Sequence, residues 1–335
     1  MNSIQTLAKV NLYDAGFGKD VVKLTVLLWV GLVLSANGLF AKPVVWSESL
    51  AEQALQDVKM LAADNMQGRK PGTQGHKAAQ QYIVERFQSL ELKPWGPKFR
   101  QRFEYRVGFK NKIGANLVAW RQGARFPHRY LVVTAHYDHL GGTGTRIYHG
   151  ADDNASGVAA LLLLAGHFSR HAPEHSIIFL ATDAEEDGLR GAKAFLQQFH
   201  EPEAHIALNI NLDMLGQGGR RHTLFVAGTR DEPKLRVLID FVATSVRTSE
   251  FRLKRGHDRR GRGRMFEGNQ RVDWRQASDH GPFIKLGIPY LYFGVDTHRH
   301  YHQTSDTYDN LDQPFFRQAV HAVWRSALAI DASLE

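Results

Sequence analysis

The chain has 335 residues, of which 43% are hydrophobic and 23% charged, a composition typical of a globular protein with a full core. It contains no cysteine, which excludes disulfide bonds, thiolate metal sites and a cysteine nucleophile. The net charge is +8. Because cysteine is absent, any metal site must use His, Asp and Glu.

An apolar segment occupies residues 24–41, follows Lys19 and Lys23, and ends in small residues. Its length fits the apolar core of an export signal and lies at the short limit for a membrane span. We interpret residues 1–41 as a cleaved export signal, which predicts a periplasmic or secreted protein. An N-terminal membrane anchor and a buried helix are the alternatives.

The first part of the following body shows two amphipathic patterns and then three strand patterns. The spacing of apolar residues predicts helices over 47–65 and 76–90, joined by a turn-rich connector at 68–75. Apolar runs predict strands over 99–107, 115–120 and 130–136.

From residue 156 onwards, helical and strand patterns alternate. Helices are predicted over 156–168, 189–199, 232–246 and 315–330, and strands over 176–183, 205–215 and 288–295. This alternation predicts an α/β three-layer sandwich with a mixed, largely parallel central sheet and helices on both faces. Residues 42–335 read as one domain.

Metal-type side chains gather where the predicted strands end. His136 and Asp138 end one strand, and by themselves fit a metal site, a catalytic dyad or a polar strand end equally. Four further segments, 150–157, 182–188, 211–216 and 301–307, carry His, Asp or Glu at comparable places. Ligands of α/β folds bind at this edge of the sheet, so the five segments together favour a metal site.

Five motifs, GRKPGTQG, GADDNASG, EEDGLRG, SDHGPF and YHQTSDT, stand in one order along the body. In this order the chain resembles the M28 family of metallo-aminopeptidases, which use two zinc ions. The resemblance implies that Asp152 bridges both ions, with His136 and Asp213 completing one and Glu186 and His302 the other. Cobalt or manganese are possible substitutes for a set of nitrogen and oxygen ligands. The family's cis peptide bond would follow Asp152.

The resemblance also implies the chemistry. Glu185, next to the ligand Glu186, would accept the proton of a metal-activated water as general base. Asp138 would accept the imidazole N–H of His136 and orient that ligand. The expected substrates are peptides with a free N-terminus.

Three other functions stay open on the same scaffold. They are a glutaminyl cyclase with one working zinc ion, a carboxypeptidase, and a non-catalytic binding module. Arg275 stands where some relatives have a tyrosine that helps to hold the oxyanion. We interpret Ser278 or Asp279, and separately Ser156, as caps of the helices that follow them.

A strongly basic segment at 251–266 carries seven Lys and Arg residues against one Asp. It has three glycines and no hydrophobic period, so we predict a solvated loop. Nucleic-acid binding is disfavoured because no aromatic platform or helix-turn-helix pattern accompanies the charge. Residues 252–264 are instead expected to contact an anionic envelope surface or acidic substrates.

Overall fold

The computed structural model describes residues 45–144, 146–199, 205–230, 232–258 and 273–334. The residues from Ser47 to Glu335 form one compact unit. The apolar segment 24–41 lies outside the described residues, as does the predicted export signal as a whole. Within the described ranges, no helix is both long and apolar enough to cross a membrane.

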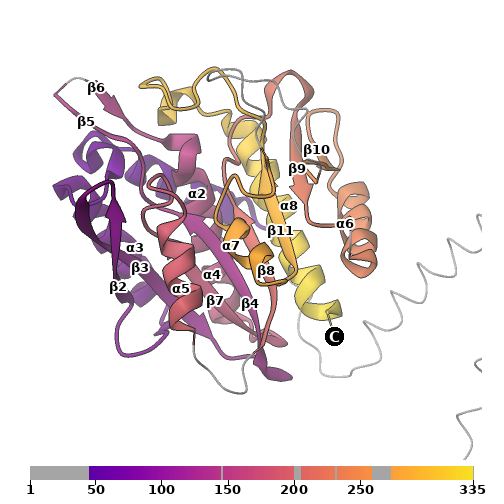
Figure 1. The fold of residues 1–335 in the computed structure, drawn as a ribbon. Coiled ribbons are helices and arrows are strands. Elements are labelled where there is room, and N and C mark those ends of the chain that lie inside the picture. Colours follow the sequence, from indigo (N-terminus) through magenta and orange to yellow (C-terminus); the bar gives the residue numbers. More distant parts are fainter. Residues whose placement is uncertain (1–44, 145, 200–204, 231, 259–272, 335) are drawn as a thin grey trace, which may run out of the picture. The chain divides into compact units, whose positions relative to one another are not determined.

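A sheet of nine strands forms the centre of the described unit, in the order β1-β3-β7-β4-β8-β11-β9-β10, with β2 paired to β3 (Figure 1). Its strands β4, β7, β8 and β11 run parallel, whereas the flanking pairs β3–β7 and β11–β9 are antiparallel. The mixed, centrally parallel sheet confirms the predicted fold class. The strands are β1 (Lys93–Pro94), β2 (Arg100–Val107), β3 (Lys110–Arg121), β4 (Phe126–His136), β7 (His175–Thr182), β8 (His205–Leu212), β9 (Thr223–Ala227), β10 (Arg252–Arg255) and β11 (Tyr290–Gly294).

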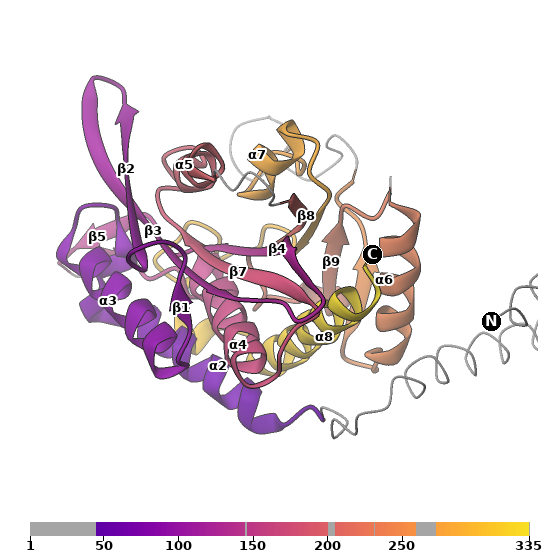
Figure 2. The same ribbon diagram turned by 90° about the horizontal axis from the view of Figure 1, so that it is seen from below.

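Helices cover both faces of this sheet, which lies edge-on between them in Figure 2. One face carries the small helices α5 (Arg190–Gln198) and α7 (His280–Lys285), which pack together. The other face carries the remaining helices, with α4 at its centre against α2 and α8. These are α2 (Glu48–Leu61), α3 (Gln74–Ser89), α4 (Gly157–Arg170), α6 (Pro233–Ser245) and α8 (Gln313–Ser333).

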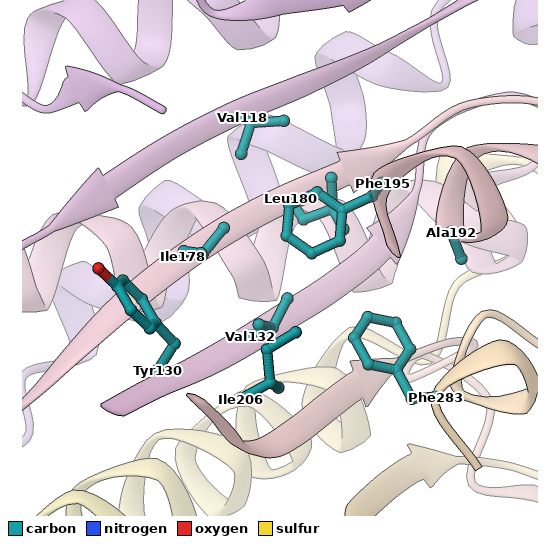
Figure 3. Packing of buried hydrophobic residues seen from close by; sticks show 9 residues of the cluster. All are labelled: Val118, Tyr130, Val132, Ile178, Leu180, Ala192, Phe195, Ile206 and Phe283. Carbon is teal, nitrogen blue, oxygen red and sulfur yellow. The ribbon is translucent and has the colours of Figure 1, made fainter. Parts of the chain in front are cut away.

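The apolar core between the sheet and the α5–α7 layer is drawn in Figure 3. Alternate residues of the central strands point to this face, as the two-residue period of a strand requires. They meet Phe195 of α5 and Phe283 of α7, both almost fully buried. The packing fixes the central strands, whose carboxyl ends carry the candidate ligands.

The register of the central strands brings distant residues to one edge. His136 at the end of β4 pairs with Thr182 at the end of β7, and Thr134 pairs with Asn211 near the end of β8. Segments that follow β4, β7, β8 and β11 therefore start at the same edge of the sheet, as predicted.

The basic segment is not wholly a loop. Its first residues, Arg252–Arg255, form strand β10, which pairs in parallel with β9 at the edge of the sheet. Leu253 is buried there, while Arg255 donates a hydrogen bond to Asp240 of α6 at 2.7 Å. Residues 256–258 form neither helix nor strand, and residues 259–266, the rest of the basic segment, lie outside the described residues.

The residues predicted to cap two helices make no capping hydrogen bond with their side chains in the structure. Asp279 begins α7, but its carboxylate accepts a hydrogen bond from Thr182 rather than from the helix. Ser278 accepts a hydrogen bond from Asn211, and Ser156 donates to the carbonyl of Asp152. These polar groups bond to the ends of β7 and β8 and to the turn before α4 instead of capping helices.

Candidate metal centre

Two groups of ligand-type side chains meet at the carboxyl edge of the sheet. His136, Asp153 and Asp213 form the first group, with potential ligand atoms all within 4.8 Å of one another. The Nε2 atom of His136 lies 3.3 Å from Asp153 Oδ1 and 3.4 Å from Asp213 Oδ1. They come from the end of β4, the turn before α4, and the end of β8.

The second group shares Asp153. The Nε2 atom of His302 lies 3.2 Å from Asp153 Oδ2 and 3.5 Å from Glu186 Oε1. His139 also belongs here: its ligand atom and those of Asp153 and Glu186 all lie within 4.8 Å of one another, with Nδ1 at 3.0 Å from Glu186 Oε1. One carboxylate therefore presents one oxygen atom to each group.

The shared residue is Asp153, and the prediction of Asp152 was wrong by one position. Asp152 Oδ1 accepts hydrogen bonds from Gly216 N–H at 2.6 Å and from Ser156 O–H at 3.1 Å. Its Oδ2 lies 3.0 Å from Nε2 of His298. Because these contacts engage both oxygens of Asp152, only the carboxylate of its neighbour Asp153 lies against both ligand groups. The cis peptide bond follows Asp153, joining it to Asn154, and not Asp152.

The backbone around Asp153 is held by Asp306, which sequence reasoning missed. The two oxygens of Asp306 accept the N–H groups of Asp152 and Asp153 at 2.9 and 3.0 Å. Since Asp306 lies four residues after His302, this contact joins the loop of one candidate ligand to the loop of another. The motif YHQTSDT contained the signal, but it was read only for its histidine.

Asp138 also acts differently from its predicted role. Nδ1 of His136 lies 3.1 Å from the backbone oxygen of Asp138 but 3.9 Å from the carboxylate, too far for a hydrogen bond. The Asp138 carboxylate instead accepts the backbone N–H groups of Glu185 and Glu186 at 3.0 and 3.4 Å. Asp138 therefore orients the imidazole through its main chain and the Glu185–Glu186 dipeptide through its side chain.

The candidate ligands shift the pKa values of one another: those of the His136 and His302 imidazoles rise, and those of the Asp153 and Glu186 carboxylates fall. Burial alone would lower the pKa of His136, but Glu185 and Asp213 raise it well above its usual value. Burial and the charge of Asp153 would raise the pKa of Glu186, but hydrogen bonds from His139 and His302 lower it to about 2. The carboxylates of the two groups therefore stabilise a positive charge placed between them.

The pKa of Glu185 is shifted in the opposite direction from that of its neighbour Glu186. Burial, followed by the charges of Glu186 and Asp279, raises its pKa well above the usual value for a glutamate, although His136 opposes this. A carboxylate with a raised pKa is a better proton acceptor than an ordinary one, which suits a general base.

The donor set fits metal ions. Asp213 Oδ1 is buried and makes no hydrogen bond among the described residues, although it lies beside His136. A buried carboxylate oxygen without a donor is costly unless a cation or another partner compensates it. Nitrogen and oxygen donors in groups of three suit zinc with one position open.

A buried arginine from the connector supports this edge of the sheet, and sequence reasoning missed it as well. Arg69 is fully buried and donates to the carbonyls of Leu61, Tyr137, His149 and Gly150 at 2.6–2.8 Å. Tyr137 lies between His136 and Asp138, and Gly150 precedes the turn that carries Asp153. Burial lowers the pKa of Arg69 to about 10, although four nearby carboxylates raise it.

Three further histidines and Arg275 have partners outside the two ligand groups. His298 contacts Asp152, and Nδ1 of His300 lies 2.9 Å from Ser305 Oγ. His149 lies beside Asp64, away from the candidate ligands. Arg275 lines a separate cavity of about 200 Å³ with Arg230 and Tyr290, so the structure does not bring it to the two ligand groups.

Comparison with known proteins finds similar metalloproteases and peptidases. The sequence profile of peptidase family M28 matches residues 116–327. A probable zinc metalloprotease of Pyrenophora tritici-repentis is 31% identical over 51% of this chain and 44% of its own length. An aminopeptidase of Bacillus subtilis is 26% identical over 63% of this chain and 43% of its own length. The chain thus spans less than half of either relative.

Among solved structures, the glutaminyl cyclase of Fimbriiglobus ruber superposes with a TM-score of 0.67. It is 21% identical and covers 88% of this chain and 99% of its own. At that identity the likeness shows a common fold.

Proposed function

Because the chain belongs to peptidase family M28, we propose that it is a zinc-dependent aminopeptidase whose two metal ions share Asp153. The position of that carboxylate carries the proposal: Oδ1 lies 3.3 Å from His136 and Oδ2 lies 3.2 Å from His302. His136 and Asp213 complete one ligand set, and Glu186 and His302 complete the other. Cobalt or manganese would also suit these donors.

Zinc held by these residues would supply Lewis-acid polarisation of the scissile carbonyl and would lower the pKa of water at the site. Glu185 accepts the proton of that water and delivers it to the leaving amine. Asp138 holds the backbone N–H groups of Glu185 and Glu186, so the base and the neighbouring ligand keep a fixed separation.

The substrates we propose are peptides with a free N-terminus. A protonated α-amine is attracted to the carboxylates that surround the site, whereas an acetylated terminus carries no charge. The charge of the site therefore favours cleavage at the first peptide bond.

A panel of aminoacyl chromogenic substrates, assayed with and without a chelator, tests this function. Turnover should require zinc and should disappear when the substrate amine is acetylated. Hydrolysis that resists the chelator, or equal cleavage of acetylated peptides, would refute it. Peptides blocked only at the carboxyl end should be cleaved, which separates this activity from that of a carboxypeptidase.

The same assays separate the proposal from cyclase chemistry. An N-terminal glutaminyl peptide should be hydrolysed, releasing free glutamine, rather than converted to a pyroglutamyl peptide. Two zinc ions per chain are expected, where a cyclase with one working zinc would hold one. Cyclisation with a single zinc ion would transfer the assignment to that class.

We also propose export, supported by the apolar segment 24–41 and the small residues at its end. Fractionation of cells that produce the full chain should place a shortened protein in the periplasm or medium. A full-length protein in the membrane fraction would instead indicate an anchor.

The basic segment 252–264 is proposed to contact anionic envelope polymers or acidic substrates. Replacing Arg259, Arg260, Arg262 and Arg264 with serine should weaken retention on anionic vesicles or alter the preference for acidic peptides. Turnover of a neutral substrate should stay unchanged, because the segment lies outside the candidate ligand motifs. Complete loss of turnover in a folded variant would contradict this role.

A further inference from the structure

His139 lies at the second ligand group but belongs to neither predicted ligand set. Its side chain is almost fully buried, and Nδ1 lies 3.0 Å from Glu186 Oε1 and 3.8 Å from Asp153 Oδ2. Its ring centre is 5.9 Å from that of His302. Distance alone allows two functions: a further metal ligand, or a donor that holds Glu186.

The ring of His139 is held tightly against the backbone. A Cβ atom on Gly150 would lie 2.6 Å from Cδ2 of His139, so the glycine is needed for this close approach. Gly150 also has a positive φ of 59°, which favours glycine. The imidazole therefore has little freedom to turn away from Glu186.

The second ring nitrogen distinguishes the two functions. Histidines that bind a metal through one nitrogen usually donate the other N–H to an acceptor. His136 follows this rule, because its Nδ1 has the Asp138 carbonyl at 3.1 Å. Nε2 of His139 is buried and has no hydrogen-bond partner among the described residues.

If His139 bound a metal through Nδ1, its proton would have to sit on Nε2, buried without an acceptor. An unsatisfied buried donor costs roughly 1–3 kcal/mol. With the proton on Nδ1, the N–H donates directly to Glu186 and only an acceptor lone pair is left without a partner. The geometry thus favours the second arrangement.

We propose that His139 is a positioning residue: its Nδ1–H fixes the carboxylate of Glu186 at the second metal position. The inference rests on the proposed function, because Glu186 must be a metal ligand for its orientation to matter. It predicts that the affinity of one zinc ion depends on a hydrogen bond from position 139, and that the other ion is little affected.

Asparagine and leucine at position 139 provide the test. Asn Nδ2 lies the same number of bonds from the backbone as His Nδ1, so His139→Asn keeps a donor near Glu186. His139→Leu removes the donor. His149→Asn is the matched control, since His149 contacts Asp64 and not the candidate ligands.

The measurement is zinc affinity at each of the two positions, by titration of the metal-free full chain against a competing chelator. His139→Leu should weaken binding of one ion about 10–100-fold, as loss of a ligand-orienting hydrogen bond does. His139→Asn and His149→Asn should stay within roughly threefold of the wild type at both positions. Melting of the metal-free variants controls for folding, and His139→Ala replaces the leucine variant should that one not fold.

Two results would overturn the inference. If the asparagine variant is as weak as the leucine variant, His139 binds the metal directly. If the leucine variant binds both ions normally, Glu186 needs no help from His139. Failure of the proposed function is distinguishable, because the wild-type chain itself would then bind fewer than two zinc ions.

Discussion

Glu185 and Glu186 are chemically identical neighbours with different surroundings. Glu186 faces His139 and His302, whereas the raised pKa of Glu185 follows from burial and from nearby carboxylates. From these contacts, and not from residue type, we propose Glu186 as the ligand and Glu185 as the base.

This difference gives the first prediction. Glu185→Gln should keep both zinc ions and lower turnover by roughly 10²–10⁴-fold, because it removes only the proton acceptor. Glu186→Ala should lose one zinc ion. Elemental analysis and turnover of a single substrate decide the roles. A glutamine variant that loses zinc, or that keeps near-full activity with both ions, would contradict the assignment.

A second prediction concerns Arg69. Arg69→Lys should lower the free energy of unfolding by about 2 kcal/mol or more, since an ammonium group cannot reach four carbonyls that a guanidinium satisfies. Arg121→Lys, on the exposed end of β3, is the control and should change little. Denaturant unfolding of the metal-free proteins measures both. Equal stability of the two variants would show that the buried hydrogen bonds of Arg69 are dispensable.

The sequence predicted most candidate site residues but not how they connect. His136, Asp213, Glu186 and His302 lie together as expected, because strand ends in a parallel sheet meet at one edge. The choice between Asp152 and Asp153 could not be made, since both are aspartates in one turn. It depends on hydrogen bonds to Asp152 from Ser156, in the same turn, and from Gly216, which is remote in sequence.

At the scale of elements, long periodic segments were predicted well, whereas the short strands β9 and β10 were not. Helix α4 and strand β7 are almost wholly buried, so their apolar runs were unambiguous. Strand β10 was taken for a loop because three of its four residues are exposed and basic, which is common at a sheet edge. Strand β9, with five residues, showed no period long enough to recognise.

Helix α4 supplies a pH-dependent prediction. Burial, followed by the charges of His171 and Arg170, lowers the pKa of His167 to about 4, against about 6.5 in an unfolded chain. As the pH falls from 6.5 toward 4, the unfolded chain gains a proton at this residue that the folded chain does not. The stability contributed by neutral His167 is complete above pH 6.5 and is lost below it.

His167→Gln should therefore lose less stability than the wild type between pH 7 and pH 4.5. Urea unfolding of the two chelator-treated proteins at both pH values measures the difference. Wild-type and variant curves that shift by the same amount would exclude His167 as a source of acid sensitivity.

At the scale of the whole molecule, the fold brings two loops far apart in sequence to one set of carboxylates. Asp306 ties the His302 loop to the turn at Asp153, and Asp138 ties the end of β4 to Glu185 and Glu186.

Metal removal should leave the ligand carboxylates of Asp153, Asp213 and Glu186 without their cations. The melting temperature should then fall by about 8 °C or more, since a ligand at 1,000 times its Kd contributes about 4 kcal/mol. Zinc added back should restore it, and an unchanged melting temperature would contradict a tightly bound metal.

The central claim is that two zinc ions share Asp153, and zinc content per chain tests it most directly. The wild type, Asp153→Asn and Asp152→Asn would be loaded with zinc, desalted and analysed for metal and protein. Asp152→Asn keeps an oxygen for Gly216 and Ser156, so it serves as the matched control. The account predicts two zinc ions in the wild type and in Asp152→Asn, and fewer than one in Asp153→Asn. Full zinc content in Asp153→Asn, or loss of zinc from Asp152→Asn alone, would contradict it.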